Sequence, residues 1–320
     1  MFDLLIHADW SANEASKRQM AVAERASVGW QVTDVKQVPP NFLEVQLFGK
    51  KRVLAGFDFP IGLPAAYGKQ TGFRDFREAL AAFGDGDWAE FYTVAEEKKD
   101  ISIQRPFYPK NVMPKGSKKR TYLLEALLRK ELDTARADDL RRRCEYRTQK
   151  RPAASPIFWT LGAKQVGKAA IDGWQHVIRP ALERGARLWP FDGRLADLSN
   201  AANCVLCETY PAEAYGHISN QFPVKGKRKQ EVRRAGAEEM RKFAPRCGIE
   251  FAAKVQKQMG DGFGPDPSGE DAYDALAGLL SMIAVVQQHR DECGPLTPDE
   301  LAWEGWIMGL ATKDLLTACS

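Results

Sequence analysis

Acidic side chains stand at the ends of three apolar segments of the sequence. Asp9 closes LLIHAD, Asp58 lies at the end of RVLAGFDF, and Glu208 follows the apolar run CVLC. Asp271 and Asp274 are spaced i, i+3 at the start of another apolar stretch, so on a helix they share one face. Burying ionised carboxylates together costs several kcal/mol each unless cations compensate them. Acids grouped in this way therefore predict a cation-binding site.

The ligand type favours hard divalent ions. Mg²⁺ and Mn²⁺ prefer oxygen ligands, and the four histidines of the chain are too scattered for a histidine-rich centre. In two-metal sites the ions lie about 3.5–4 Å apart and support hydrolysis of phosphodiester bonds. We expect Asp9 to bridge two such ions and Asp58 and Asp274 to complete their shells. Asp271 or Glu208 would fill the remaining position.

Each of these acids except Asp274 also has a structural alternative. Residues 268–271 fit a capping box, in which Asp271 serves only the N-terminus of its helix. Asp58 could accept backbone hydrogen bonds in its Pro/Gly turn, and Asp9 could be an ordinary turn acid. Glu208 could pair with a cation of the basic stretch that follows it.

Positive charge is concentrated in two stretches. Residues 98–151 hold 17 Lys and Arg against 7 Asp and Glu, and residues 225–257 hold 11 against 4, although the net charge is only +4. Such stretches bind phosphates or are solvated helix faces. For the first alternative, we expect residues 98–151 to be a second contact and the main phosphate contacts to be Lys225, Lys227, Arg228, Lys229 and Arg233.

Alternation and turn residues predict the elements that must position the acids. Strands are expected over residues 2–9, over 17–26 and 30–38 as a hairpin, over RVLAGFDF, and over NCVLCETYP. A short helix is expected over about 41–49, a short strand over ARLWPF, and a buried helix from about Ser268 onward. Ala275 and Gly278 share the aspartate face of that last helix, and their small size predicts a close approach to the sheet.

The chain of 320 residues is 44% hydrophobic, which is enough for a packed core. No linker-like composition divides it, so we expect a single domain over 1–320 with a mostly helical elaboration over 65–200. The start lacks the features of a signal peptide, and no stretch approaches about 20 apolar residues. A cytoplasmic protein with no membrane partner is therefore expected. Cys204 and Cys207 lack a second ligand pair and are expected to be buried packing thiols.

Several sequence pieces together resemble one known family. They are HADWSA, GFDFPIGLP, WPFDG, CETYPAEAY, KGKRKQEVRR, DAYDALAGL and EGWI. The family is domain of unknown function family 429, which is grouped with RNase H-like nucleases. The resemblance extends from the first strand to Ile307, and its most specific pieces are Phe-Pro-Ile-Gly-Leu-Pro after Asp58 and Glu-Thr-Tyr-Pro-Ala at 208–212.

The resemblance implies an α/β fold with an RNase H-like mixed sheet of five strands. Three antiparallel strands would come first, helices would flank the sheet, and the large helical segment would be an insertion. Resolvases of the same superfamily place acids at the first strand, at the fourth strand and as an i, i+3 pair on the last helix. Asp9, Asp58, Asp271 and Asp274 sit in matching places, whereas Glu208 lies outside that minimal set.

These observations predict a Mg²⁺- or Mn²⁺-dependent nuclease that hydrolyses phosphodiester bonds of DNA or RNA. A second hypothesis is a nucleic-acid-binding module that keeps the fold without useful turnover, because function depends on the site and not on the fold. A third is an actin-like or sugar-kinase-type ATP-binding protein, which shares the sheet. That class needs a glycine-bearing phosphate loop after the first-strand acid, and Trp10-Ser11-Ala12-Asn13 contains no glycine.

Overall fold

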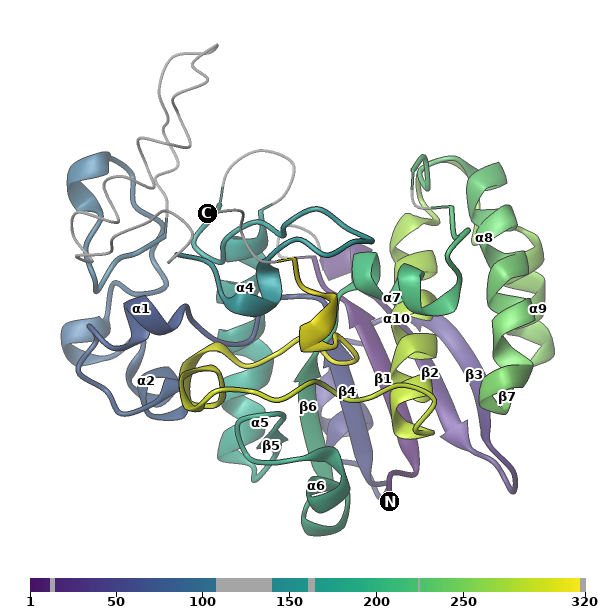
Figure 1. Ribbon diagram of the computed structural model, residues 1–320, viewed down its shortest axis with the longest axis horizontal. Helices are drawn as coiled ribbons and strands as arrows, with labels where there is room; N and C mark the ends of the chain where they lie inside the picture. Colours follow the sequence, from purple (N-terminus) through teal and green to yellow (C-terminus); the bar gives the residue numbers. More distant parts are fainter. Residues whose placement is uncertain (12–14, 108–139, 161–164, 224, 317–320) are drawn as a thin grey trace. The chain divides into compact units, whose positions relative to one another are not determined.

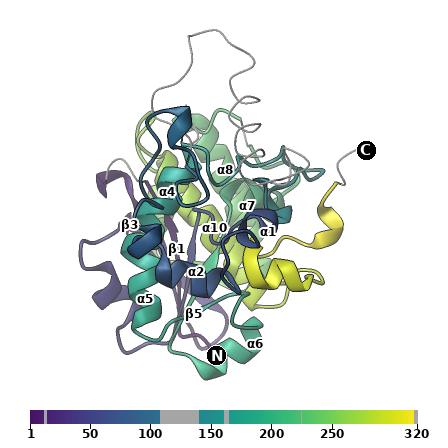
Figure 2. The ribbon, with the colours of Figure 1, turned by 90° about the vertical axis from the view of Figure 1, so that its left-hand side faces the viewer.

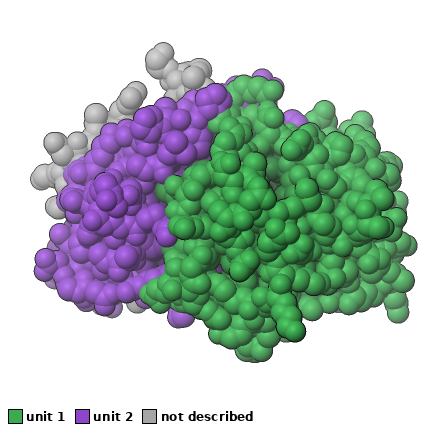
Figure 3. Space-filling view, turned by 90° about the horizontal axis from the view of Figure 1, so that it is seen from below, with its two compact units in different colours: residues 1–59, 180–294, 307–313 green, residues 60–179, 295–306, 314–320 purple. Residues whose placement is uncertain are grey.

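The computed structural model describes residues 1–11, 15–107, 140–160, 165–223 and 225–316 (Figure 1). The chain forms two compact units, which Figure 3 draws in different colours. Unit 1 comprises residues 1–59, 180–294 and 307–313, and unit 2 comprises residues 60–179, 295–306 and 314–320. All five acids expected in the site belong to unit 1.

A mixed sheet forms the centre of unit 1, in the strand order β5-β6-β4-β1-β2-β3-β7 (Figure 1). The strands are β1 (Leu4–Asp9), β2 (Gln19–Arg25), β3 (Trp30–Gln37), β4 (Val53–Phe57), β5 (Arg187–Leu188), β6 (Cys204–Glu208) and β7 (Ile249–Phe251). β1, β2 and β3 are antiparallel neighbours, whereas β4 runs parallel to β1 and β6 runs parallel to β4. The expected α/β class with a mixed sheet is therefore confirmed.

The sheet has seven strands, whereas five were expected. Both edge strands lie outside those five: β5, which has two residues, falls within ARLWPF, where a short strand was expected, and β7, which has three residues, was not expected. Segments this short contain too few residues to show an alternating pattern, so the sequence of β7 gave no strand signal. The five longer strands all fall within the segments predicted from alternation and apolar runs.

Helices cover the sheet of unit 1, and Figures 1 and 2 show α10 lying across one of its faces. They are α5 (Arg179–Glu183), α6 (Leu195–Ala201), α7 (Pro211–Ile218), α8 (Gln230–Phe243), α9 (Ala253–Gly260) and α10 (Glu270–Val286). α10 packs against β1, β2 and α7, and α9 packs against β3. Every residue of α10 from Tyr273 to Val285 is buried, which confirms the predicted buried helix.

An aromatic cluster packs on the opposite face of the sheet. The ring of Trp10 lies 6.1 Å from the ring of Phe42 and 5.9 Å from that of Phe57, between centroids. The rings of Phe57 and Phe59 are stacked at 5.1 Å. Phe42 precedes the helical turn Leu43–Leu47, which lies within the segment expected to be a short helix. The apolar residues around the end of β4 thus fill one face and leave Asp58 for the other.

The described part of unit 2 contains short helices around an aromatic core. They are α1 (Ala65–Gly68), α2 (Phe76–Ala82) and α4 (Val166–Gly173). The rings of Phe83 and Phe91 stack at 3.5 Å, and Trp174 Nε1 donates to the Pro60 carbonyl at 2.8 Å. Residues 108–139, which make up most of the basic stretch 98–151, lie outside the described residues.

The close approach of α10 to β1 depends on a glycine. A Cβ added at Gly278 would lie 2.2 Å from Nε2 of His7, whose side chain is fully buried. That distance is well inside van der Waals contact, so the prediction that small residues let this helix approach the sheet is confirmed at Gly278. Burial lowers the pKa of His7 to about 3, so the imidazole stays neutral.

Gly278→Ala is expected to lower the free energy of unfolding by about 2 kcal/mol, because the added methyl group forces α10 and His7 apart. Urea unfolding followed by circular dichroism measures the change. Gly260→Ala is the matched control: it is also a helical glycine, and its added Cβ would have its nearest neighbour, Arg241 Nη2, at 3.8 Å. Equal stabilities of the two variants would contradict the close packing at Gly278.

Candidate functional site

Asp9 and Asp58 stand at the ends of neighbouring parallel strands. The register pairs Ala8 with Phe57, so the next position of the same register pairs Asp9 with Asp58. Alternation along β1 places Asp9 on the face covered by α10, and paired residues of adjacent strands share a face. The backbone N–H of Trp10 donates to Asp58 Oδ1 at 2.7 Å and ties the end of β1 to this carboxylate. Asp58 thus accepts a backbone hydrogen bond and also faces the site.

The first turns of α10 bring Asp271 and Asp274 to the same place. Burial, followed by the charges of Asp58, Asp274 and Asp271, raises the pKa of Asp9 well above its usual value. Burial raises the pKa of Asp58 to about 7, and the charge of Asp274 acts in the same direction. Burial and the same charge raise the pKa of Asp271 to about 6. Such mutual effects require proximity, so these four residues form one aspartate cluster.

Lys227 places a cation in the aspartate cluster. Its Nζ forms an ion pair with Asp274 Oδ2 and lies 3.3 Å from Glu270 Oε1. The hydroxyl of Tyr215 donates to the other oxygen of Asp274, Oδ1. Burial is the largest single effect on the pKa of Lys227 and lowers it, but the charge and hydrogen bond of Asp274 and the charges of Glu270 and Asp9 together outweigh burial and raise that pKa above its usual value. Lys227 is therefore an ammonium ion that neutralises part of the cluster.

Tyr215 and Glu270 were not identified from the sequence. The motif CETYPAEAY contains the signal for Tyr215, because Pro211 at the first position of α7 begins a helix directly after β6. Tyr215 then lies one turn into that helix, and α7 packs against α10. Glu270 is the first residue of α10, one turn before Asp274.

Glu208 points to the other face of the sheet. The register of β4 and β6 pairs it with Phe57, and Phe57 packs in the aromatic cluster opposite α10. Alternation therefore places the Glu208 side chain, which is 4% exposed, away from Asp58. The expectation that Glu208 joins the other four acids does not match this register.

The capping-box alternative for Asp271 is wrong. α10 begins at Glu270 with Gly269 as its N-cap, and no side chain caps this end of the helix. The hydroxyl of Ser268 donates instead to the carbonyl of Pro265 at 3.1 Å. Asp271 is free to contribute its carboxylate to the aspartate cluster.

The chemistry of the donors in this cluster fits a hard divalent cation, because all four are carboxylates whose negative charges repel one another. Their positions fit it less well. Within the described ranges, no group of three or more His, Cys, Asp and Glu side chains is arranged to hold a metal ion. Lys227 and Tyr215 hold both oxygens of Asp274 in this arrangement.

Arg233 does not face solvent, contrary to its expected role as a phosphate contact. It is fully buried on α8. Its guanidinium donates to five backbone carbonyls, at 2.7–3.1 Å, which belong to Lys227, Arg228, Gly262, Gly264 and Pro265. Arg233 therefore joins the segment that carries Lys227 to the segment before α10. The expected contacts Lys225, Arg228 and Lys229 are exposed.

Arg233→Lys is expected to lower the free energy of unfolding by about 2 kcal/mol, because one ammonium cannot replace a planar guanidinium that serves five carbonyls. Arg234→Lys is the control, since that side chain is 52% exposed and pairs only loosely with Asp261 at 3.8 Å. Thermal unfolding of both variants measures the difference. A variant Arg233→Lys as stable as Arg234→Lys would contradict this role.

The cysteines agree with the expected packing role. Cys204 and Cys207 are both free and buried in β6. The Cys207 thiol contacts the carbonyl of Ala55 at 3.6 Å, and burial raises its pKa well above the usual value. These thiols are neutral packing groups.

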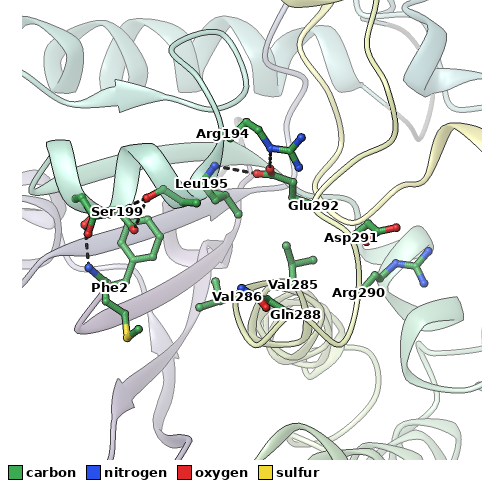
Figure 4. A pocket seen from close by; sticks show the side chains of 13 residues that line it. Phe2, Arg194, Leu195, Ser199, Val285, Val286, Gln288, Arg290, Asp291 and Glu292 are labelled. Atoms are coloured by element: carbon green, nitrogen blue, oxygen red, sulfur yellow. Dashed lines mark hydrogen bonds and ion pairs between the residues drawn. The ribbon is translucent and has the colours of Figure 1, made fainter.

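A cavity of about 630 Å³ lies in unit 1 at the other end of α10 (Figure 4). It is lined by Val285 and Val286, whereas the aspartate cluster lies at the first turns of this 17-residue helix, about 20–25 Å away at 1.5 Å per residue. The carboxylate of Glu292 pairs with Arg194 at 2.7 Å and accepts from the N–H of Leu195 at 2.9 Å. No predicted site residue lines this cavity.

The chain matches no protein-family model, no curated protein and no solved structure. Among the helices of the described residues, none has the length and apolar character needed to cross a membrane.

Proposed function

We propose that the protein is a Mg²⁺- or Mn²⁺-dependent nuclease whose active site is the aspartate cluster. The observation that carries this proposal is the convergence of Asp9, Asp58, Asp271 and Asp274, which lie far apart in the sequence. Burial raises the pKa values of all four and the charges of neighbouring carboxylates raise them further, so a bound divalent ion would stabilise the ionised forms. The bound ions would supply Lewis-acid stabilisation of the negative charge that develops during phosphodiester hydrolysis.

The strand arrangement supports an RNase H-like assignment. Three antiparallel strands come first, and β4 and β6 extend the sheet in parallel on the β1 side. Acids at the ends of the first and fourth strands and on the long buried helix match the positions at which resolvases of the RNase H-like superfamily carry theirs. We therefore propose that the chain belongs to domain of unknown function family 429.

The remaining residues of the site have distinct roles in this proposal. Tyr215 orients Asp274 through its hydroxyl, and Trp10 orients Asp58 through its backbone N–H. The exposed cations Lys225, Arg228 and Lys229 would hold phosphates of a DNA or RNA backbone. Their contacts would position the substrate without reading its sequence.

The direct test is a cleavage assay with single strands, duplexes, RNA–DNA hybrids and branched DNA, each end-labelled. Cleavage of at least one substrate is expected with Mg²⁺ or Mn²⁺, and none with EDTA. A protein that leaves all substrates intact under every metal condition would contradict the nuclease proposal.

The position of Lys227 favours a second candidate, a nucleic-acid-binding module without turnover. An ammonium that permanently neutralises Asp274 would keep the fold and the basic surface but exclude a catalytic ion. Binding of labelled nucleic acid that persists in EDTA, without cleavage in Mn²⁺, would support this candidate over the nuclease.

A further inference from the structure

We propose that Lys227 is a built-in competitor for the divalent ion, whose ammonium fills the aspartate cluster in the metal-free protein and leaves when an ion binds. This inference rests on the proposed function, because it requires an ion at the aspartate cluster. It adds that the protein alternates between an ammonium-filled and an ion-filled state.

Hydrogen bonds already occupy the Asp274 carboxylate. Tyr215 donates to Oδ1 and Lys227 to Oδ2, so both oxygens of this buried carboxylate already have a partner. Glu270 and the ring of Tyr215 also lie beside the ammonium, at 3.3 Å and at 5.9 Å from the ring centroid. A divalent ion on the same carboxylate would repel the ammonium strongly, because a buried site contains little water to screen the two positive charges from each other. The two cations therefore exclude each other.

The anchoring of the Lys227 backbone identifies what moves. Arg233 Nη1 donates to the carbonyl of Lys227 at 2.8 Å and to that of Arg228 at 2.9 Å. The buried guanidinium thus fixes the main chain, while the Lys227 side chain is 26% exposed and reaches the cluster from its edge. Rotation of this one side chain toward solvent releases the site without any rearrangement of the loop.

The displaced ammonium of Lys227 would move to a surface that already carries other cations. Lys225, Arg228 and Lys229 are all exposed on the same short segment. A displaced Lys227 would join them and add a fourth cation to the surface that holds phosphates. Ion binding would in this way strengthen substrate binding by freeing a side chain that the metal-free protein keeps occupied.

Calorimetric titration of the full chain with Mn²⁺ at pH 7.5, after removal of metals with EDTA, tests the competition. Lys227→Met removes the charge and keeps the apolar stem, and it is expected to bind Mn²⁺ at least about tenfold more tightly than the wild type. Lys51→Met is the matched control, because this lysine is exposed and precedes β4, at the opposite end of that strand from Asp58, and the variant should bind Mn²⁺ like the wild type.

A second measurement uses the wild-type chain and does not depend on a variant that folds. Acetylation of individual lysines by an N-hydroxysuccinimide ester is followed by mass spectrometry with and without Mn²⁺. Lys227 is expected to react several times faster with Mn²⁺ because its ammonium has left the cluster, while Lys225 reacts at an unchanged rate.

The outcomes separate this inference from the proposed function. If the wild type binds Mn²⁺ but Lys227→Met binds it no more tightly, or if bound Mn²⁺ leaves the reactivity of Lys227 unchanged, the competition is refuted and the nuclease proposal stands. If neither the wild type nor Lys227→Met binds Mn²⁺, the metal-dependent function itself fails.

Discussion

Asp9→Asn is expected to reduce metal-dependent cleavage by about 1,000-fold or more, because it removes the carboxylate whose pKa is raised by burial and by the charges of all three other aspartates of the cluster. The variant should fold normally. The side chain keeps its shape, and loss of one negative charge relieves repulsion within the cluster. Cleavage rates with saturating Mg²⁺, measured alongside the thermal unfolding midpoint, provide the comparison.

Asp197→Asn is the control for this experiment. Asp197 belongs to unit 1 but is exposed on α6, and it lies outside the aspartate cluster. Its variant should cleave at the wild-type rate. Undiminished cleavage by Asp9→Asn would remove Asp9 from the mechanism, and a loss of the folded state would show that its role is structural.

The stability of the metal-free protein is expected to fall by a few kcal/mol as the pH rises from about 4 to about 7. Asp58 has a folded-state pKa of about 7, raised by burial, against a usual value of 3.8. In this window the folded chain keeps protons that the unfolded chain has lost, so rising pH favours unfolding. The raised pKa values of Asp9, Asp271 and Asp274 act in the same direction.

Urea unfolding in EDTA at several pH values measures this dependence. Asp58→Asn should flatten it, because the amide cannot ionise and its oxygen can still accept the Trp10 N–H. Asp197→Asn should follow the wild-type curve. Stability that rises with pH across this window would mean that the carboxylates are not buried together as described.

Long regular patterns explain which parts could be predicted from the sequence. The five longer strands and α10 have enough residues for an apolar run, alternation or a helical face to be recognised. Because acids stood at strand ends and on one helix face, the sequence predicted that Asp9, Asp58, Glu208, Asp271 and Asp274 would converge.

The direction of the Glu208 side chain could not be predicted from the sequence. All five residues of β6 are buried, so the strand has no alternation that would reveal which face its last residue occupies. Only the register with β4 determines the direction of this side chain, and register depends on pairing over a long sequence separation.

The burial of Arg233 could have been predicted from the helical periodicity of the basic stretch 225–257. Arg233 belongs to the same face of α8 as Gly236, Ala237 and Met240, which are all buried and follow it at helical spacing. That periodicity distinguishes Arg233 from its exposed neighbours. Lys227 has no such pattern, because it precedes the helix in a short turn and finds its acidic partners only in the folded chain.

The connection between β4 and β6 has a consequence for how the chain folds during synthesis. Phe57 pairs with Glu208, so two adjacent central strands are separated by about 150 residues that include most of unit 2. The hairpin of β2 and β3 can form soon after it leaves the ribosome, but the parallel edge of β4 stays unpaired until β6 emerges. High contact order of this kind slows folding and leaves a strand edge open to other chains. A pause in translation, or capture of the chain by a chaperone, should therefore change the yield of native protein more if it occurs before residue 204 is synthesised than if it occurs after that residue.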